Sequence, residues 1–230
     1  MSLSDQDKLL AEQRIKYWFS FFDFCKEALG LKEVNGIHKD LCEFMQTNHK
    51  SKLVLMPRYS FKSTICTVAY ILWRLTKDPD IRVLIYSDAT NKAIGFLDSI
   101  KAHIEGRAGE SIFRSIFGKW ESDSKSGRWN RDQMTIAIRK MSRPEPSVDT
   151  GGIETSKTGF HYDIIIFDDI VSDKNITSKD LMDKTDQCYK NALSLLKPGG
   201  DIIMVGTRWH FGDLYGRILA EGSRFATFIT

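Results

Sequence analysis

The sequence predicts an α/β fold with a mostly parallel central sheet and helices on both of its faces. Two observations carry this prediction. Short apolar runs alternate along the chain with longer stretches of helical periodicity. These runs are apolar throughout, which is typical of strands that are buried on both faces. With 230 residues the chain is long enough for one substantial core, so we expect a single domain.

The first part of the chain, residues 1–50, is expected to form a helical segment that packs on the core at 51–230. Apolar and aromatic side chains recur at helical spacing in residues 5–29, and a second helix is expected at 38–47. The aromatic density is also compatible with a helix on a membrane surface or against a partner protein. A core helix at the sheet edge is the interpretation that this spacing favours.

The core alternates between the two types of element. We expect strands at 53–56, 82–87, 133–138, 147–149, 162–167 and 200–206. One helix is expected to begin at Lys62, and further helices are expected to cover 88–105, 178–196 and 212–219. Residues 106–128 are polar and contain many Gly and Ser, so they are expected to form an exposed loop. The Lys-Pro-Gly-Gly segment at 197–200 is expected to end the preceding helix.

Residues 53–64, Leu-Val-Leu-Met-Pro-Arg-Tyr-Ser-Phe-Lys-Ser-Thr, have the strand–loop–helix context of a phosphate-binding loop. Backbone N–H groups of such a loop and of the following helix point at a phosphate. Lys62 would then reach the β- and γ-phosphates, and the Ser63 hydroxyl would bind Mg²⁺. Met56 and Phe61 stand where the G-x-x-x-x-G-K-[ST] pattern has glycine. Because the match is incomplete, a chance occurrence of a lysine at a helix start is the alternative.

A second motif lies at the end of the apolar run at 162–167, where two carboxylates follow, Asp168 and Asp169. In a phosphate-loop ATPase the first acid at such a strand end holds Mg²⁺, and the next orients the attacking water. The alternative is that the pair only ends a strand and starts a turn. The two motifs occur in the required order with room for further strands between them. Together they indicate an ATPase with ATP as its substrate and Mg²⁺ as its metal.

Composition sets outer bounds on function. The chain is 42% hydrophobic and 27% charged, as is usual for a globular domain, and its net charge is +3. Any surface for nucleic acid must therefore be a local patch. The four cysteines form no C-x-x-C pair, which argues against a structural zinc site and is compatible with a reducing cytosol. No apolar run approaches the roughly 20 residues of a membrane span.

A third segment is Gly-Thr-Arg-Trp-His at 206–210, directly after a strand. With Met-Pro-Arg-x-x-x-Lys-Ser-Thr at 56–64, Thr-Gly-x-His-x-Asp at 158–163 and the Asp-Asp pair, it resembles the large terminase subunit of tailed bacteriophages. That subunit is the motor that packages DNA into the procapsid. The four elements span most of the chain in the order that the family uses. The resemblance implies a phosphate-loop NTPase fold of the additional-strand type.

The resemblance also implies residue roles. Arg58 corresponds to a loop arginine proposed to act in cis on the γ-phosphate, although a salt bridge to Asp168 or Asp169 is equally compatible with its position. The expected catalytic residues are Asp169 and Arg58, the metal ligands Ser63 and Asp168, and the coupling residue Thr207. The expected nucleotide-binding residues are Arg58, Tyr59, Ser60, Phe61, Lys62, Ser63, Thr64 and His38.

Three of these assignments depart from the family pattern or have a simpler alternative. Tyr59, Ser60 and Phe61 would offer backbone N–H groups, but non-glycine residues avoid the left-handed conformations that such loops use. Family members usually have Asp-Glu where this chain has Asp-Asp, so the shorter Asp169 needs a shifted backbone or a second water to reach its target. His38 lies where terminases place adenine contacts, and the simpler interpretation is a histidine on a helix surface.

The partners that the resemblance implies are double-stranded DNA, the portal protein of the procapsid and the small terminase subunit. It further implies a ring during packaging, a monomer in isolation, no membrane, and a location in the host cytoplasm with transient residence at the portal vertex. Family members carry a nuclease domain after this region, so we expect the chain to be an N-terminal ATPase domain without it. A helicase-like, nucleic-acid-dependent ATPase shares the loop and the acid pair and is the alternative.

Overall fold

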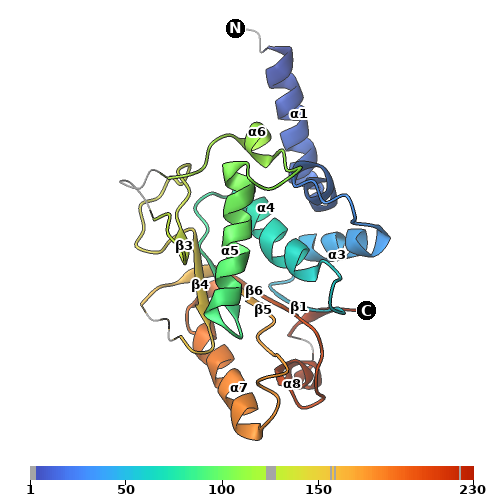
Figure 1. The fold of residues 1–230 in the computed structure, drawn as a ribbon, viewed down its shortest axis with the longest axis vertical. Coiled ribbons are helices and arrows are strands. Elements are labelled where there is room, and N and C mark those ends of the chain that lie inside the picture. Colours follow the sequence, from blue (N-terminus) through green and yellow to red (C-terminus); the bar gives the residue numbers. More distant parts are fainter. Residues whose placement is uncertain (1–3, 123–127, 156, 158, 223) are drawn as a thin grey trace.

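The computed structural model describes residues 4–230 except 123–127, 156, 158 and 223. A seven-stranded sheet lies at its centre, in the order β3-β4-β2-β5-β6-β1-β7 (Figure 1). The strands are β1 (Ser51–Leu55), β2 (Val83–Ser87), β3 (Gln133–Met134), β4 (Val148–Gly152), β5 (Tyr162–Asp168), β6 (Leu196–Gly206) and β7 (Ala226–Ile229). All neighbouring pairs are parallel except β3 with β4, so the predicted class, an α/β fold with a mostly parallel sheet, is confirmed.

Helices cover both faces of this sheet. They are α1 (Asp5–Phe19), α2 (Phe21–Asp23), α3 (Gly36–Gln46), α4 (Tyr70–Lys77), α5 (Thr90–Glu105), α6 (Phe113–Phe117), α7 (Lys179–Leu193) and α8 (Leu214–Glu221), with π-helical turns η1 (Phe24–Ala28) and η2 (Thr64–Ala69). In Figure 1, α7 and α8 lie below the sheet, α3 and α4 lie above it, and α5 runs in front of it. None of the described helices is long and apolar enough to cross a membrane.

Alternate residues of the central strands enter two separate cores. In β5, Ile164 and Ile166 join the core under α4 and α5, whereas Ile165 and Phe167 join the core under α7 and α8. This explains why the strand sequences are apolar throughout: side chains point alternately to two faces, and both faces are covered.

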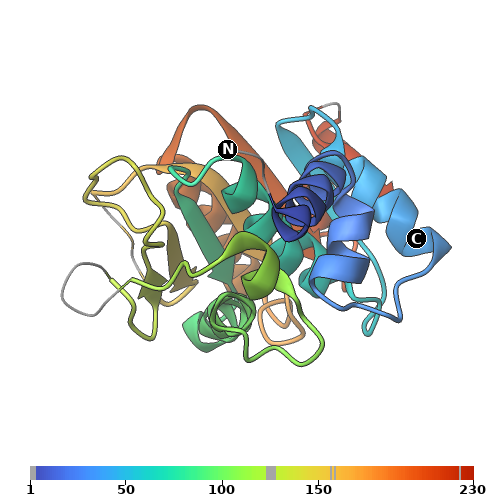
Figure 2. The same ribbon diagram turned by 90° about the horizontal axis from the view of Figure 1, so that it is seen from above.

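The N-terminal helices belong to the first of these cores. Tyr17, Phe21 and Phe24 are buried there, and the indole N–H of Trp73 on α4 donates to the Tyr17 carbonyl at 2.8 Å. The core interpretation of residues 5–29 therefore holds for these side chains, whereas others of α1, such as Phe19, are exposed. The helix is also interrupted at Ser20, whose extended backbone lets its hydroxyl accept from the Asp23 N–H at 3.1 Å. Figure 2 shows these helices at one end of the sheet and the segment around β3 at the other.

Three boundaries differ from those expected. The helix expected at 178–196 ends at Leu193, and β6 already begins at Leu196, so that Lys197–Gly200 lies within a strand. A register irregularity between β5 and β6 accommodates Pro198 there, because a bulge frees a proline from the ladder. The described part of the loop expected at 106–128 contains α6, and the strand expected at 133–138 is only Gln133–Met134.

The topology brings distant segments to one edge. The parallel strands β1, β6, β5 and β2 lie side by side in this order, with β6 between β1 and β5. Their carboxyl ends therefore meet at the same edge of the sheet, which is where open α/β sheets usually bind ligands. The loop after β1, the acid pair after β5 and the segment after β6 all emerge there.

Candidate active site at the carboxyl edge of the sheet

The loop between β1 and the next helix adopts the left-handed conformations that bulky residues normally avoid. Tyr59 has φ 63° and Phe61 has φ 55°, and the helix begins at Lys62. Each such residue costs about 1–3 kcal/mol and persists only where its surroundings hold it. The Ser60 hydroxyl donates to the Pro57 carbonyl at 2.7 Å across the turn. The loop therefore takes the backbone shape that glycine usually permits, although it contains no glycine.

His38 supports this loop from α3. Its Nδ1 accepts the Asn35 backbone N–H at 3.0 Å, so Nε2 carries the proton and donates to the Ser60 carbonyl at 3.1 Å. The imidazole also meets the Phe61 ring edge to face, with the ring centroids 5.7 Å apart. Since the side chain is buried, the interpretation as a surface histidine is wrong. Contact with adenine remains a prediction.

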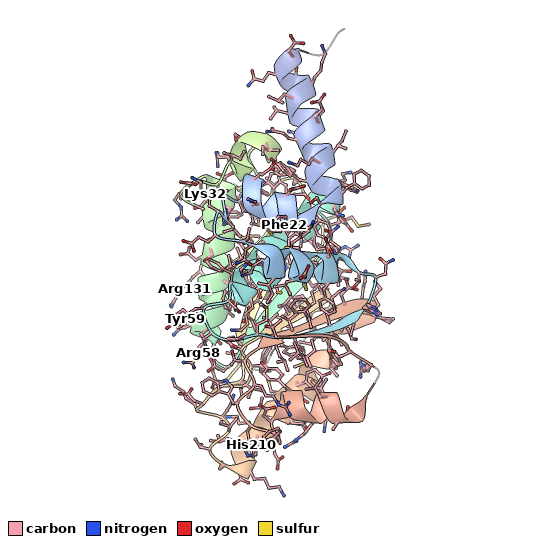
Figure 3. All side chains as sticks on the ribbon, turned by 90° about the vertical axis from the view of Figure 1, so that its right-hand side faces the viewer. Phe22, Lys32, Arg58, Tyr59, Arg131 and His210 are labelled. Atoms are coloured by element: carbon pink, nitrogen blue, oxygen red, sulfur yellow. The ribbon has the colours of Figure 1, made fainter. Side chains whose placement is uncertain are left out.

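Lys62 is buried beneath the loop. Its amine donates to the Pro57 carbonyl at 3.4 Å, and this distance makes the hydrogen bond a weak one. Among the described residues, no carboxylate forms an ion pair with it. A buried ammonium with one weak partner has donors left for an anion at the mouth of the loop, where the Tyr59 side chain is fully exposed beside Arg58 (Figure 3).

Asp168 connects the two motifs across 105 positions of sequence. Its Oδ1 accepts the Ser63 hydroxyl at 2.8 Å, its Oδ2 accepts the Thr67 hydroxyl, and its carbonyl accepts the Ser87 hydroxyl at 2.6 Å. Complete burial raises the pKa of this carboxyl, the Thr67 and Ser63 hydrogen bonds and Lys62 oppose the rise, Asp169 adds to it, and the resulting pKa is about 7. A cation beside Asp168 would favour its ionised form.

Asp169 has a different environment although it is the next residue. Its backbone is left-handed, with φ 48°, and its N–H donates to the Val205 carbonyl of β6 at 2.8 Å. Its Oδ1 is buried and has no hydrogen-bond partner. Buried carboxylate oxygens are rarely left unpaired, so this atom is a candidate for contact with a water or a ligand.

Arg58 does not pair with either acid in the structure. Its guanidinium lies over the ring of Trp209, 4.5 Å from the centroid. Trp209 follows β6, and its backbone N–H donates to the Asp213 carboxylate at 3.3 Å. Arg58 thus makes a cation–π contact, and the alternative of a salt bridge to Asp168 or Asp169 is not seen. An action of Arg58 on a phosphate remains a prediction.

Thr207 connects the ends of two strands. Its hydroxyl donates to the Met56 carbonyl at 3.1 Å, so β6 and the start of the loop are joined directly at the edge. Its role in coupling remains a prediction. Thr64 opens η2 and is partly buried, and its contact with a nucleotide remains a prediction.

Sequence reasoning missed several residues of this site. Thr67 and Ser87 bind Asp168, Trp209 stacks on Arg58, and Asp213 caps α8 through the Gly216 N–H at 2.8 Å. Only Asp213 has a local signal, since an aspartate before a helical pattern is a common N-cap. The other contacts join segments that are distant in sequence. Of the Thr-Gly-x-His-x-Asp element, Thr158 lies outside the described residues.

The site residues suit a magnesium ion that also binds a nucleotide. Ser63 and Asp168 present hydroxyl and carboxylate oxygens, which Mg²⁺ prefers, and Asp169 adds an unpaired buried oxygen. The described part of the chain holds no group of three or more His, Cys, Asp or Glu side chains that could bind a metal alone. Phosphate oxygens and waters would therefore have to complete the coordination shell.

Comparison with known proteins agrees with the motifs. No family model matches the chain. A curated relative, the terminase large subunit of Enterobacteria phage T3, is 24% identical over 210 residues, which cover 89% of this chain. The chain spans about a third of the length of that relative, 34%. The resemblance drawn from the sequence is confirmed at this level: the chain is similar to a phage large terminase subunit.

Proposed function

We propose that the chain is the ATPase motor domain of a viral DNA-packaging terminase. The observation that carries this proposal is the hydrogen bond of Ser63 to Asp168, which joins the end of the loop after β1 to the end of β5. Phosphate-loop ATPases bring together a helix-start hydroxyl and a strand-end acid in this way to share one Mg²⁺. The position of β6 between β1 and β5 supports the additional-strand type of this fold.

In the proposed reaction Lys62 and the backbone N–H groups of residues 59–63 bind the β- and γ-phosphates of ATP. Asp169 orients the attacking water through its unpaired carboxylate oxygen. Arg58 leaves the Trp209 ring and neutralises charge on the γ-phosphate as the transition state forms. Ser63 and Asp168 would hold Mg²⁺, which would supply positive charge to neutralise the phosphate oxygens.

The biological setting follows from the relative and from the motifs. ATP hydrolysis would drive double-stranded DNA into a procapsid, with the portal protein and the small terminase subunit as partners. Thr207, which joins β6 to the loop, would transmit the state of the nucleotide to the segment that follows β6. We place this activity in the host cytoplasm and transiently at the portal vertex.

The test replaces Lys62 with alanine. Lys62→Ala should lower ATP turnover by at least about a hundredfold, because it removes the charge that meets the phosphates in the transition state. Lys140→Ala removes one exposed lysine from a loop away from the site and should turn over ATP like the parent. Unfolding midpoints of both variants should match the parent. Parental turnover in a folded Lys62→Ala variant would refute the assignment.

A further inference from the structure

Thr67 carries a buried hydroxyl and is not among the residues expected to bind the nucleotide or the metal. It lies on η2, one turn after Ser63, and its side chain is fully buried. Its hydroxyl donates to Oδ2 of Asp168, while Ser63 donates to Oδ1 of the same carboxylate. One helical turn thus holds both oxygens of the acid that ends β5.

The residues around Thr67 are apolar or weakly polar, so a hydroxyl among them calls for a hydrogen-bond partner. Ile65, Cys66, Val68 and Ala69 on the same turn are all buried and apolar or weakly polar. A valine would fill the same volume in such a core without a polar group to satisfy. The hydroxyl is accommodated because Asp168 accepts its hydrogen bond, so the two side chains depend on each other.

The backbone of this turn is also unusual. Residues Thr64–Ala69 form a π-helical turn, in which the Tyr70 N–H reaches the Ile65 carbonyl five positions back. Such turns are rare and occur often at functional sites. Here the wide turn begins directly after Ser63 and contains Thr67, so both hydroxyls that meet Asp168 lie at or in it.

We propose that Thr67 is a positioning residue for the metal centre of the proposed ATPase. By donating to Oδ2 it fixes the rotation of the Asp168 carboxylate, so that Oδ1 stays on the Ser63 hydroxyl and the remaining lone pairs face the metal position. Thr67 itself touches neither metal nor nucleotide. The inference rests on the proposed function. It adds a residue that acts through a metal ligand and belongs to neither sequence motif.

The test uses Thr67→Val, which keeps the shape and removes the hydroxyl, and Thr67→Ser, which keeps the hydroxyl. Loss of an outer partner of a metal ligand typically costs 10–100-fold in metal affinity. We therefore expect Thr67→Val to raise the Mg²⁺ concentration for half-maximal ATP turnover by about 10–100-fold. Turnover at saturating Mg²⁺ should fall less, and binding of metal-free ATP should stay at the parental level. In Thr67→Ser the Mg²⁺ concentration for half-maximal turnover should stay within about threefold of the parental value, because this variant keeps the hydroxyl that binds the metal ligand.

Two further variants keep the test decisive. Thr185→Val removes a buried hydroxyl from α7, where it donates to the Leu181 carbonyl at 3.0 Å, and should leave the metal dependence unchanged. Thr67→Ala serves as the second probe if Thr67→Val does not fold, since it adds no bulk. Manganese binding followed by electron paramagnetic resonance, with ATP present, reports metal affinity apart from turnover.

The outcomes separate the two proposals. If the parent binds ATP with Mg²⁺ but folded Thr67→Val and Thr67→Ala variants keep the parental metal dependence, Thr67 is structural only and the inference is overturned. A lower unfolding midpoint with unchanged metal dependence has the same meaning. If the parent itself shows no metal-dependent ATP binding, the proposed function fails and the inference fails with it.

Discussion

At the residue scale, two adjacent aspartates receive different chemistry from their surroundings. Asp168 is fully buried, and both of its oxygens accept hydroxyl hydrogen bonds. Asp169 is partly exposed, left-handed, and has one buried oxygen without a partner. In the proposed function Asp168 would hold the metal and Asp169 would orient the water, and the two roles would be separated by environment and backbone direction, since the residue type is the same.

The Asp169 assignment predicts that Asp169→Asn keeps ATP binding within about threefold and lowers turnover by about a hundredfold or more, because an amide is a poor base for the attacking water. Asparagine tolerates left-handed backbone, so this change avoids the strain that alanine would introduce at φ 48°. Single-turnover hydrolysis and equilibrium ATP binding are the measurements. Asp173→Asn, at an exposed position four residues on, is the control. Parental turnover in Asp169→Asn would mean that another carboxylate is catalytic.

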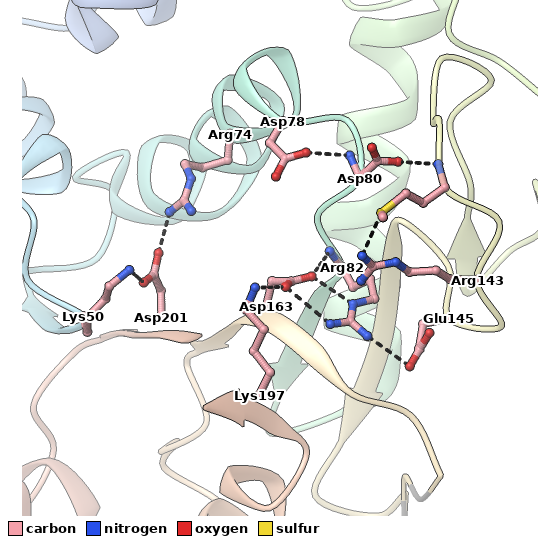
Figure 4. A network of polar contacts seen from close by, with 11 residues as sticks. Lys50, Arg74, Asp78, Asp80, Arg82, Arg143, Glu145, Asp163, Lys197 and Asp201 are labelled. Carbon is pink, nitrogen blue, oxygen red and sulfur yellow. Dashed lines mark hydrogen bonds and ion pairs between the residues drawn. The ribbon is translucent and has the colours of Figure 1, made fainter. Parts of the chain in front are cut away.

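At the element scale, ion pairs at the amino-terminal edge of the sheet hold the strands that form the site at the opposite edge. Arg82 directly precedes β2 and donates twice to Oδ2 of Asp163 on β5, from its side-chain Nε at 2.9 Å and from its backbone N–H at 2.8 Å. Asp163 also forms an ion pair with Lys197 of β6 (Figure 4). Arg82 in turn reaches Glu145 at 3.2 Å. Because one carboxylate joins three neighbouring strands, it holds the register on which the alignment of Asp168 with β2 and β6 depends.

This network predicts a dependence of stability on pH. Burial raises the pKa of Asp163, but the hydrogen bonds from Arg82 and Lys197 outweigh burial and lower it to about 2 from the ordinary 3.8. A carboxyl whose pKa is lower in the folded than in the unfolded state stabilises the fold at pH values above its unfolded pKa. This stabilisation is lost as the pH falls from about 4 to about 2. The contribution at neutral pH is up to about 2 kcal/mol.

Urea unfolding at pH 6 and pH 3 measures this contribution. The parent should lose more free energy of unfolding between the two values than Asp163→Asn, which has no proton to gain. Asp98→Asn, at a largely exposed side chain 3.9 Å from Arg107, should lose as much as the parent. Equal losses in the parent and in Asp163→Asn would show that this network does not titrate in the predicted window.

At the scale of the whole molecule, the arrangement of arginines favours catalysis within one chain. Arg58 lies in the loop that leads to Lys62, and its guanidinium contacts the Trp209 ring. Three arginines, Arg128, Arg131 and Arg139, are the nearest candidates for action on a neighbouring subunit, and each donates at least one hydrogen bond within the chain, although Nε and Nη2 of Arg139 have no partner among the described residues. Arg139 donates to the Glu145 carbonyl at 2.6 Å, Arg131 donates to the Asn91 side chain at 3.1 Å, and Arg128 donates to the Pro144 carbonyl. Release of Arg58 requires the loss of one cation–π contact, about 0.5–2 kcal/mol.

Turnover per molecule should therefore be independent of protein concentration. Arg58→Ala should lower turnover far more than ATP affinity, because the partner charge develops mainly in the transition state. Steady-state turnover across a hundredfold range of concentration measures this, with sedimentation to report assembly. A steep rise of turnover with concentration, lost in Arg131→Ala and retained in Arg58→Ala, would instead assign the arginine to a neighbouring subunit.

Local patterns in the sequence determined the class of fold, most of its strands and helices, and the segments that reach the site. Hydrophobic periodicity and punctuation by Pro and Gly are local properties, so they predict β5 and α5 to within two residues. The same locality explains the error at residues 197–200. Pro198 and two glycines are typical of a helix end, and only the pairing with β5 makes this segment the start of β6.

Tertiary structure alone decided how the site is assembled. The strand order that places β6 between β1 and β5, the contacts of Ser63 and Thr67 with Asp168, and the stacking of Arg58 on Trp209 all join segments distant in sequence. The left-handed backbone of Phe61 contradicts its own local preference and exists because His38 and the core hold the ring. Local propensities are worth fractions of a kcal/mol per residue, whereas packing and burial contribute more, so long-range contacts decide wherever the two conflict.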